Sequence, residues 1–172
     1  GGRRSLADVR SGEYEGLEAR SDAPDFGPAF NPTAGATAIG ARQFLIAYNV
    51  NILGTSNQAH RIALNLREAG RGEDEPGRLR EVKGMGWQVD DYNLAQVTVN
   101  LTDYEVTPPH VLFEEVKKDA AALNVGVAGS EIVGVVPLAA ILMAAEYYIH
   151  AENLFILEED QKVRLAVVGL TR

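Results

Sequence analysis

Four amide side chains stand at alternating positions in two largely apolar segments of the sequence. Asn49 and Asn51 alternate with apolar residues in the first segment, and Gln96 and Asn100 do so in the second. Because successive side chains of a strand point to opposite faces, each pair is expected on one side of its strand. Amides carry both donors and acceptors. The pattern therefore predicts either a surface that hydrogen-bonds a ligand or the wet side of a half-buried antiparallel sheet.

Glu131 is an ionisable residue inside the apolar segment GSEIVG. A carboxylate that is taken out of water needs a partner. We expect this partner to be either an amino group of a ligand or an arginine of the protein itself.

Histidine and cysteine, the usual carriers of acid–base and metal chemistry, are sparse. The sequence has no cysteine, and its three histidines, His60, His110 and His150, lie far apart without metal-ligand spacing. We expect His60 on a helix surface and His110 in a packing or capping role at the start of a helix. No metal site and no catalytic histidine are predicted.

Two further groups of residues resemble ligand sites only superficially. The glycine-rich run AGRGEDEPG lacks the lysine and hydroxyl ending of a phosphate-binding loop. The basic residues around it are expected on a solvated surface, the alternative being contacts with ligand carboxylates. They are Arg71, Arg78, Arg80 and Lys83.

The chain has 172 residues, 46% of them hydrophobic and 23% charged, which is typical of a folded domain. The net charge of −8 and the absence of a basic cluster argue against nucleic-acid binding. No apolar run reaches the ~20 residues of a membrane span, and the N-terminus does not resemble a signal peptide. We expect a cytoplasmic protein without membrane or nucleic-acid partners.

Hydrophobic periodicity divides the sequence near Gly40. Residues 3–11 predict a short helix that ends at Gly12, and a stretch rich in Gly, Pro and Ala follows it. So long a connection is typical of a linker or a functional loop. We therefore assign residues 1–39 to a linker with a short helix and residues 40–172 to the folded domain.

Strands and helices alternate within residues 40–172. Residues 41–53 alternate with period two and predict a strand with Phe44 and Ile46 on its apolar face. A helix is expected from an N-cap at Ser56 to Gly70. Two strands joined by residues 90–93 follow, with Val97 and Val99 on the apolar face of the second.

The remaining segments complete the predicted order of elements. Pro108 and Pro109 begin a helix, since proline is tolerated in a first turn. A buried strand around Glu131 comes next, then an apolar helix over 138–153 and a hairpin that turns at residues 159–161. The order β-α-β-β-α-β is that of a ferredoxin-like α+β fold, in which helices cover one face of an antiparallel sheet. The other face must meet water, a ligand or a second sheet.

Six segments, in order and at the right spacing, resemble the C-terminal subdomain of glutamate formimidoyltransferase, which also occurs in the bifunctional formimidoyltransferase-cyclodeaminase. The resemblance runs from Gly40 to about Leu170, and RRSLADVRSGEYEGL and APDFGP resemble the linker between the family's two subdomains. The six segments are GARQFLIAYNVNI, NQAHRIALNLREAGRG, PGRLREVKGMGW, NLAQVTVNLTDYEVT, HVLFEEV and GSEIVGVVPLAAIL.

The resemblance implies a transferase of one-carbon groups. Family members move a formimino group between N-formiminoglutamate and N5 of tetrahydrofolate in histidine degradation, with tetrahydrofolate as co-substrate and no metal. Folate lies in a tunnel between two subdomains that stack sheet against sheet, and the proton-transferring histidine belongs to the N-terminal subdomain. No catalytic residue is therefore assigned to this chain. The acidic loop GEDEP departs from the more basic loop of the family, so no role in steering the acidic folate tail is assigned to it.

The resemblance turns the open sheet face into a predicted folate-binding wall. Pterin is a flat, hydrogen-bonding heterocycle that suits amide side chains. The residues that we expect to bind folate are Asn49, Asn51, Gln96, Asn100 and Glu131.

Two further expectations concern partners. We expect an N-terminal formimidoyltransferase subdomain as a partner in cis or in trans, and a homo-oligomer. In the isolated chain we expect the open sheet face either to self-associate or to bind folate weakly compared with the intact enzyme. The missing initiator methionine and the retained linker favour a fragment of a longer protein. The alternative is a stand-alone ferredoxin-like module that binds or assembles without catalysis.

Overall fold

A computed structural model describes residues 6–20, 24–27 and 30–151. The contacts of the chain separate two units, Gly1–Arg42 and Gln43–Arg172. The assignment of residues 1–39 as a linker between subdomains remains a prediction.

The first unit holds short helical segments and turns. The helix predicted over residues 3–11 is described as α1, Leu6–Arg10, and a 3-10 turn follows over Glu15–Leu17. Gly12 has a φ of 81°, a conformation that favours glycine and ends the helix. The ring of Tyr14 stacks on Phe30 with 5.1 Å between the centroids, and its hydroxyl donates to the backbone carbonyl of Asn31.

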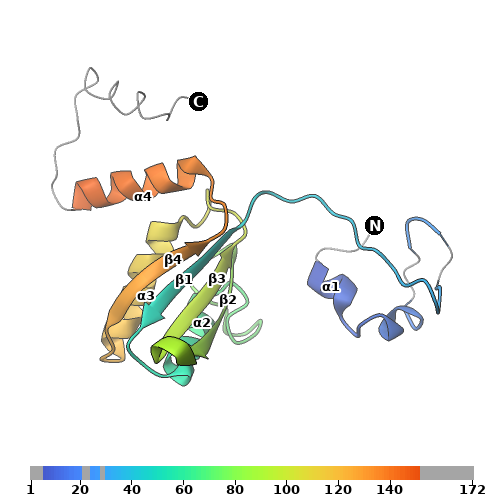
Figure 1. The fold of residues 1–172 in the computed structure, drawn as a ribbon, viewed down its shortest axis with the longest axis horizontal. Helices are drawn as coiled ribbons and strands as arrows, with labels where there is room; N and C mark the ends of the chain where they lie inside the picture. The colour runs from blue at the N-terminus through green and yellow to red at the C-terminus, as the bar shows by residue number, and fades with distance from the viewer. Residues whose placement is uncertain (1–5, 21–23, 28–29, 152–172) are drawn as a thin grey trace, which may run out of the picture. The chain divides into compact units, whose positions relative to one another are not determined.

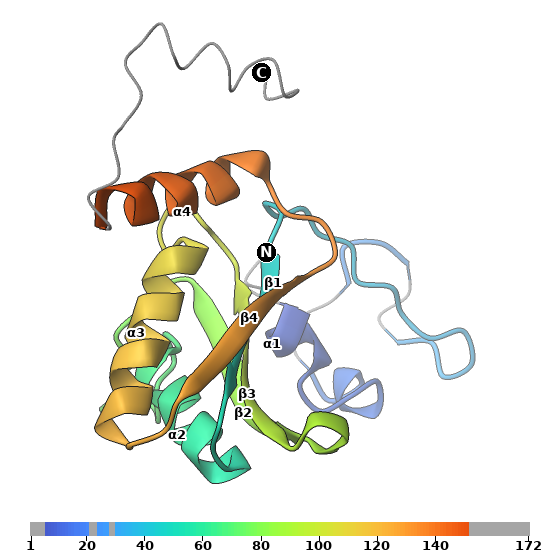
Figure 2. The ribbon, with the colours of Figure 1, turned by 60° about the vertical axis from the view of Figure 1, so that its left-hand side comes forward.

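The second unit is a four-stranded antiparallel sheet with helices on one face, which confirms the ferredoxin-like α+β fold (Figures 1 and 2). The strands lie in the order β2-β3-β1-β4, so that β1 pairs with both β3 and β4. Their bounds are Ile46–Ile52 for β1, Val82–Val89 for β2, Leu94–Leu101 for β3 and Val127–Val133 for β4.

Helices α2, Ser56–Leu66, and α3, Pro109–Ala122, cover the same face of the sheet, with α2 on β2 and β3 and α3 on β1 and β4. Their apolar stripes meet the apolar side of the strands, where Ile46, Val97 and Val99 are at most 2% exposed. Burial of these side chains is the main force that fixes the sheet to the helices. Gly86 marks the closest approach, because a Cβ there would lie 2.0 Å from the backbone nitrogen of His60.

Strand β1 and helix α2 begin and end differently from the prediction. Phe44 precedes β1 and is 77% exposed, so its assignment to the core face was wrong. The N-cap of α2 is Thr55 and not Ser56: the Thr55 side chain accepts a hydrogen bond from the Gln58 backbone, and Gln58 reaches back to the Thr55 backbone. The helix ends at Leu66, four residues before Gly70, because the chain becomes extended at Arg67.

The last two described elements are more exposed than their apolar sequences predict. β4 is not a buried strand: it pairs with β1 alone and lies at an edge of the sheet, with Val133 54% exposed. In α4, Leu138–Ala151, Ala140 is the one residue described as buried, and the helix contacts α3. The hairpin predicted to turn at residues 159–161 lies outside the described residues.

Candidate functional site

The face of the sheet opposite α2 and α3 gathers polar side chains from three strands. The pairing of β1 with β3 places Asn51 opposite Gln96, and the pairing of β1 with β4 places Asn49 opposite Glu131. Side chains at such paired positions on one face are close enough to interact. Four of the five predicted binding residues are thereby brought together.

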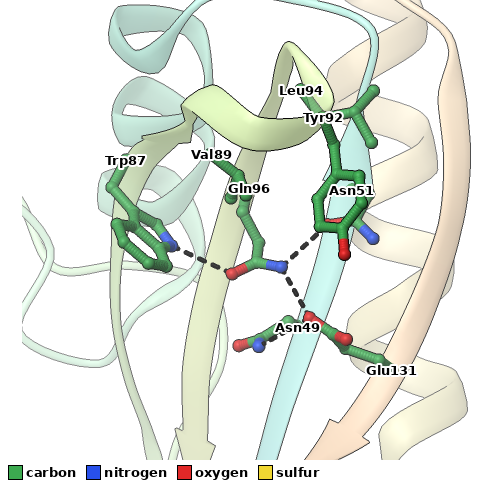
Figure 3. A pocket seen from close by; sticks show the side chains of 8 residues that line it. All are labelled: Asn49, Asn51, Trp87, Val89, Tyr92, Leu94, Gln96 and Glu131. Atoms are coloured by element: carbon green, nitrogen blue, oxygen red, sulfur yellow. Dashed lines mark hydrogen bonds between the residues drawn. The ribbon is translucent and has the colours of Figure 1, made fainter.

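Hydrogen bonds connect these four side chains into one network (Figure 3). Gln96 Nε2 donates to Asn51 Oδ1 at 2.8 Å and to Glu131 Oε1 at 2.7 Å. Asn49 Nδ2 donates to the same Glu131 Oε1 at 3.1 Å. The partners of Glu131 in the described structure are therefore two amides and not an arginine of the protein.

The network is only partly open to solvent. Gln96 is 5% and Asn49 is 9% exposed, whereas Glu131 is exposed. Buried amides that are fully hydrogen-bonded hold a fixed arrangement. At Asn49 and Gln96 the structure therefore has a packed polar layer and not the wet sheet surface that was one of the two alternatives.

A pocket of about 220 Å³ opens over this layer. Polar groups form one part of its lining, and the apolar part comes from the β2–β3 hairpin at its side (Figure 3). A flat ring with polar edges suits such a mixed lining. The lining residues are Asn49, Asn51, Trp87, Val89, Tyr92, Leu94, Gln96 and Glu131.

Asn100, the fifth predicted residue, does not lie in this pocket. It is exposed on the same face, where it pairs with Ala47 of β1 and Lys83 of β2, four residues along β3 from Gln96. Alternation alone places Asn100 on the correct face. Its distance from the other amides follows from its position along the strand.

Trp87 is the site residue that the sequence analysis missed. Its indole Nε1 donates to Gln96 Oε1 at 3.0 Å and to Thr98 Oγ1 at 2.8 Å, and Thr98 Oγ1 lies 3.2 Å from Gln96 Oε1. Trp87 is 48% exposed, so the indole ring also borders the pocket. Trp87 and Met85 are two residues apart in β2, so alternation places both on one face, and strand pairing makes this the face of the amides. This alternation could have indicated Trp87 as a site residue.

None of the three histidines lines the pocket. His60 on α2 and His150 on α4 are exposed. His110 lies at the start of α3, where its ring stacks on Tyr147 of α4 with 4.7 Å between centroids, and its Nδ1 is buried without a partner in the described structure. Burial lowers the pKa of His110, and the nearby Glu114 carboxylate opposes this shift. The packing role expected for His110 is the one the structure shows.

Two of the basic residues are occupied by carboxylates on the helix side of the unit. Arg78 pairs with Glu115 at 2.9 Å and with Asp119 at 2.6 Å, which raises its pKa although partial burial opposes the shift. Arg71 pairs with Glu75 at 3.1 Å. Arg80 and Lys83 are exposed.

The described residues contain no cluster of three or more His, Cys, Asp or Glu side chains with the geometry of a metal site. Within the same ranges, no helix is long and apolar enough to cross a membrane.

Comparisons with known proteins identify two matching families along the chain. Residues 47–171 match the family described as "Formiminotransferase domain". Residues 1–42 match the family described as "Formiminotransferase domain, N-terminal subdomain".

Curated relatives carry corresponding names. The chain is 65% identical to a formimidoyltransferase-cyclodeaminase of Dictyostelium discoideum, over 98% of this chain and 32% of that protein. It is 54% identical to the mouse protein of that name, over 96% of this chain and 31% of the relative. A glutamate formimidoyltransferase of Streptococcus pyogenes is 39% identical, over 88% of this chain and 50% of the relative. The chain thus spans between about a third and half of the length of these relatives.

Proposed function

This chain belongs to the formiminotransferase family, and from this premise we propose that it forms the folate-binding C-terminal subdomain of a glutamate formimidoyltransferase. The complete enzyme would transfer a formimino group between N-formimino-L-glutamate and tetrahydrofolate in histidine degradation, and we expect it to work in the cytoplasm. The observation that carries the proposal is the pocket over Asn49, Asn51, Gln96 and Glu131 on the sheet face opposite α2 and α3.

The lining of this pocket supports a folate ligand. A pterin ring offers hydrogen-bond donors and acceptors along its edge, and the amide and carboxylate groups supply complementary partners. Trp87 and Leu94 supply apolar surface for the faces of the ring. Tetrahydrofolate enters as co-substrate, and the proposal needs no metal.

The small size of the pocket supports the proposal that a second surface covers the ligand. Its volume of about 220 Å³ is below the ~300–1,000 Å³ of pockets that enclose a whole ligand of folate size. This face would therefore hold one end of the folate while an N-terminal subdomain covers the rest. We propose that residues 1–39 connect the two subdomains; because residues 1–42 match the N-terminal family description, the connection would include the end of that subdomain.

The transfer step requires a group that moves a proton. N5 of tetrahydrofolate attacks the formimino carbon, the bond from this carbon to the glutamate nitrogen breaks, and the N5 proton ends on the released glutamate amine. A positioned acid–base residue accelerates such a step. Because no histidine lines the pocket, we propose that this residue belongs to the N-terminal subdomain. Asn49, Asn51, Gln96, Asn100 and Glu131 would bind and orient the folate.

A reconstitution experiment tests the proposal. The 172-residue chain is assayed for tetrahydrofolate-dependent consumption of formiminoglutamate, alone and together with an N-terminal formimidoyltransferase subdomain in cis or in trans. We expect no turnover by the chain alone and turnover by the combination. Turnover by the chain alone would contradict the assignment of the acid–base residue. Folate binding without turnover in the combination would instead favour a binding module without catalysis.

A further inference from the structure

Trp87, Gln96 and Glu131 form a relay of hydrogen bonds across three strands. Gln96 stands between the other two: its Oε1 receives the indole N–H of Trp87 at 3.0 Å, and its Nε2 donates to Glu131 Oε1 at 2.7 Å. The three residues come from β2, β3 and β4 (Figure 3). Their arrangement fixes which atoms reach the pocket.

The direction of the relay is set at Trp87. An indole N–H donates and never accepts, so the side-chain oxygen of Gln96 must face it. The opposite end of the amide, Nε2, therefore faces Glu131. A flipped amide would place NH₂ against the indole N–H and an oxygen against the carboxylate. Since Gln96 is 5% exposed, water cannot readily compensate for these two mismatches.

The relay occupies one oxygen of Glu131 and leaves the other available. Oε1 accepts from both Gln96 Nε2 and Asn49 Nδ2, at 2.7 and 3.1 Å. Within the described ranges, Oε2 makes no hydrogen bond, and Glu131 is exposed and lines the pocket. At this point the pocket presents an acceptor that carries negative charge.

We propose that Trp87 and Gln96 are positioning residues that hold Glu131 so that its Oε2 accepts a hydrogen bond from a ring amino group of the ligand. This inference rests on the proposed function, and within it the donor is the 2-amino group of the pterin. The acidic tail of the folate would lie away from Glu131, because two carboxylates at hydrogen-bond distance repel each other.

The discriminating measurement is a ratio of two affinities. The chain is titrated with 5-formyltetrahydrofolate and with its 2-desamino-2-methyl analogue, which lacks the amino donor. We expect the amino ligand to bind about 10- to 100-fold more tightly, as is typical of a hydrogen bond to a charged group. Because both affinities are measured on the same protein, partial loss of folded protein cancels in the ratio.

Three variants separate the relay from a general packing role. In Glu131→Gln the inward oxygen is still held by Gln96 and Asn49, so the outward atom becomes an N–H donor and the ratio falls to about 1 or below. Trp87→Phe keeps the aromatic ring and removes the indole donor, so that Gln96 Oε1 keeps only the Thr98 hydroxyl, which can donate or accept. Gln96→Met removes the link to Glu131. Both should lower the ratio several-fold. Met85→Leu, on the same face of β2 and outside the pocket lining, is the matched control and should keep the parental ratio.

Each result decides between the inference and the proposed function. Measurable and equal binding of both ligands by the parental chain overturns the inference and leaves the folate proposal standing. Binding of neither ligand at millimolar concentration, by the chain alone and by the chain combined with the N-terminal subdomain, overturns both. If Glu131→Gln keeps the affinity ratio of the parental chain, the proposed role of Glu131 is wrong. If Trp87→Phe and Gln96→Met both keep that ratio, their proposed positioning role is wrong. If Glu131→Gln does not fold, the other two variants carry the test.

Discussion

Gln96 and Asn100 show how differently two amides on one strand face can behave. Gln96 is 5% exposed and hydrogen-bonds to Trp87, Asn51 and Glu131, whereas Asn100 is exposed. An alternating pattern cannot distinguish them, because both positions have the same parity along β3.

This difference predicts unequal stability effects. Gln96→Ala removes the hydrogen bond that Asn51 Oδ1 accepts and one of the two acceptors of the Trp87 indole, so we expect a loss of about 1–3 kcal/mol in the free energy of unfolding. Asn100→Ala should stay within about 0.5 kcal/mol of the parent. Urea unfolding of the two variants measures the contrast. An effect of Gln96→Ala within about 0.5 kcal/mol of the parent would show that the polar layer over β1 does not contribute to stability.

His110 makes the stability of the helix layer depend on pH. Its ring stacks on Tyr147, its Nδ1 is buried, and the Glu114 carboxylate acts on it electrostatically. Glu114 is itself engaged by Lys117 and by the Tyr148 hydroxyl. Burial lowers the pKa of His110 below 6.5 in the folded chain, so the unfolded chain binds this proton more readily. The contribution of His110 to stability is complete above pH 6.5 and is lost as the pH falls from 6.5 to the lowered value.

The measurement is the free energy of unfolding between pH 7.5 and 5, compared with that of His110→Phe. The phenylalanine keeps a stacking ring and cannot titrate, so the part of the pH dependence that His110 supplies should disappear. An unchanged profile in His110→Phe would assign the pH dependence to other groups.

At the scale of elements, helix α2 begins with a capping box at Thr55 and Gln58. Thr55 and Gln58 form reciprocal side-chain to backbone hydrogen bonds, which satisfy donors that a helix terminus otherwise leaves open. Ser56 makes no such capping bond, since it is the first residue of the helix.

We therefore expect Thr55→Ala to lower the free energy of unfolding by about 1 kcal/mol. Ser56→Ala is the matched control, and its effect should be within about 0.5 kcal/mol. Thermal or urea unfolding of the two variants decides between the caps. A larger effect at Ser56 would restore the N-cap that the sequence pattern favours.

At the scale of the whole molecule, the sheet face opposite α2 and α3 carries exposed apolar side chains in the part of the chain that the structure describes. Met85 is 56% and Trp87 is 48% exposed on this face, and exposed apolar surface of this kind favours association. In the complete enzyme we propose that the N-terminal subdomain covers it. In the isolated chain, a second copy of the same chain can bind to this face.

We expect the isolated chain to self-associate through this face. Met85→Ser removes apolar surface from both copies and should weaken association by at least about tenfold. Lys118→Ser, on α3 and 70% exposed at its side chain, is the control on the helix side of the sheet. Sedimentation equilibrium measures both. A monomeric parental chain, or equal effects of the two substitutions, would contradict the expectation.

The sequence by itself determined the element types and the faces of the strands. Period two in residues 94–101 assigned Val97 and Val99 to the core and Gln96 and Asn100 to the other side, and the structure agrees on all four. The sequence also predicted the apolar stripe of α2. These are local properties, because the direction of a side chain within a strand or helix follows from its own segment.

Only the tertiary structure decided which of these residues meet. Because β1 lies between β3 and β4, Asn49 and Asn51 bring Gln96 and Glu131 into one hydrogen-bonded layer, while the register of the strands leaves Asn100 outside the pocket. Trp87 joins this layer through the pairing of β2 with β3. The apolar strand around Glu131 likewise becomes an exposed edge, which its composition did not show. Strand neighbours and register depend on contacts between distant segments, and a pattern within one segment carries no information about them.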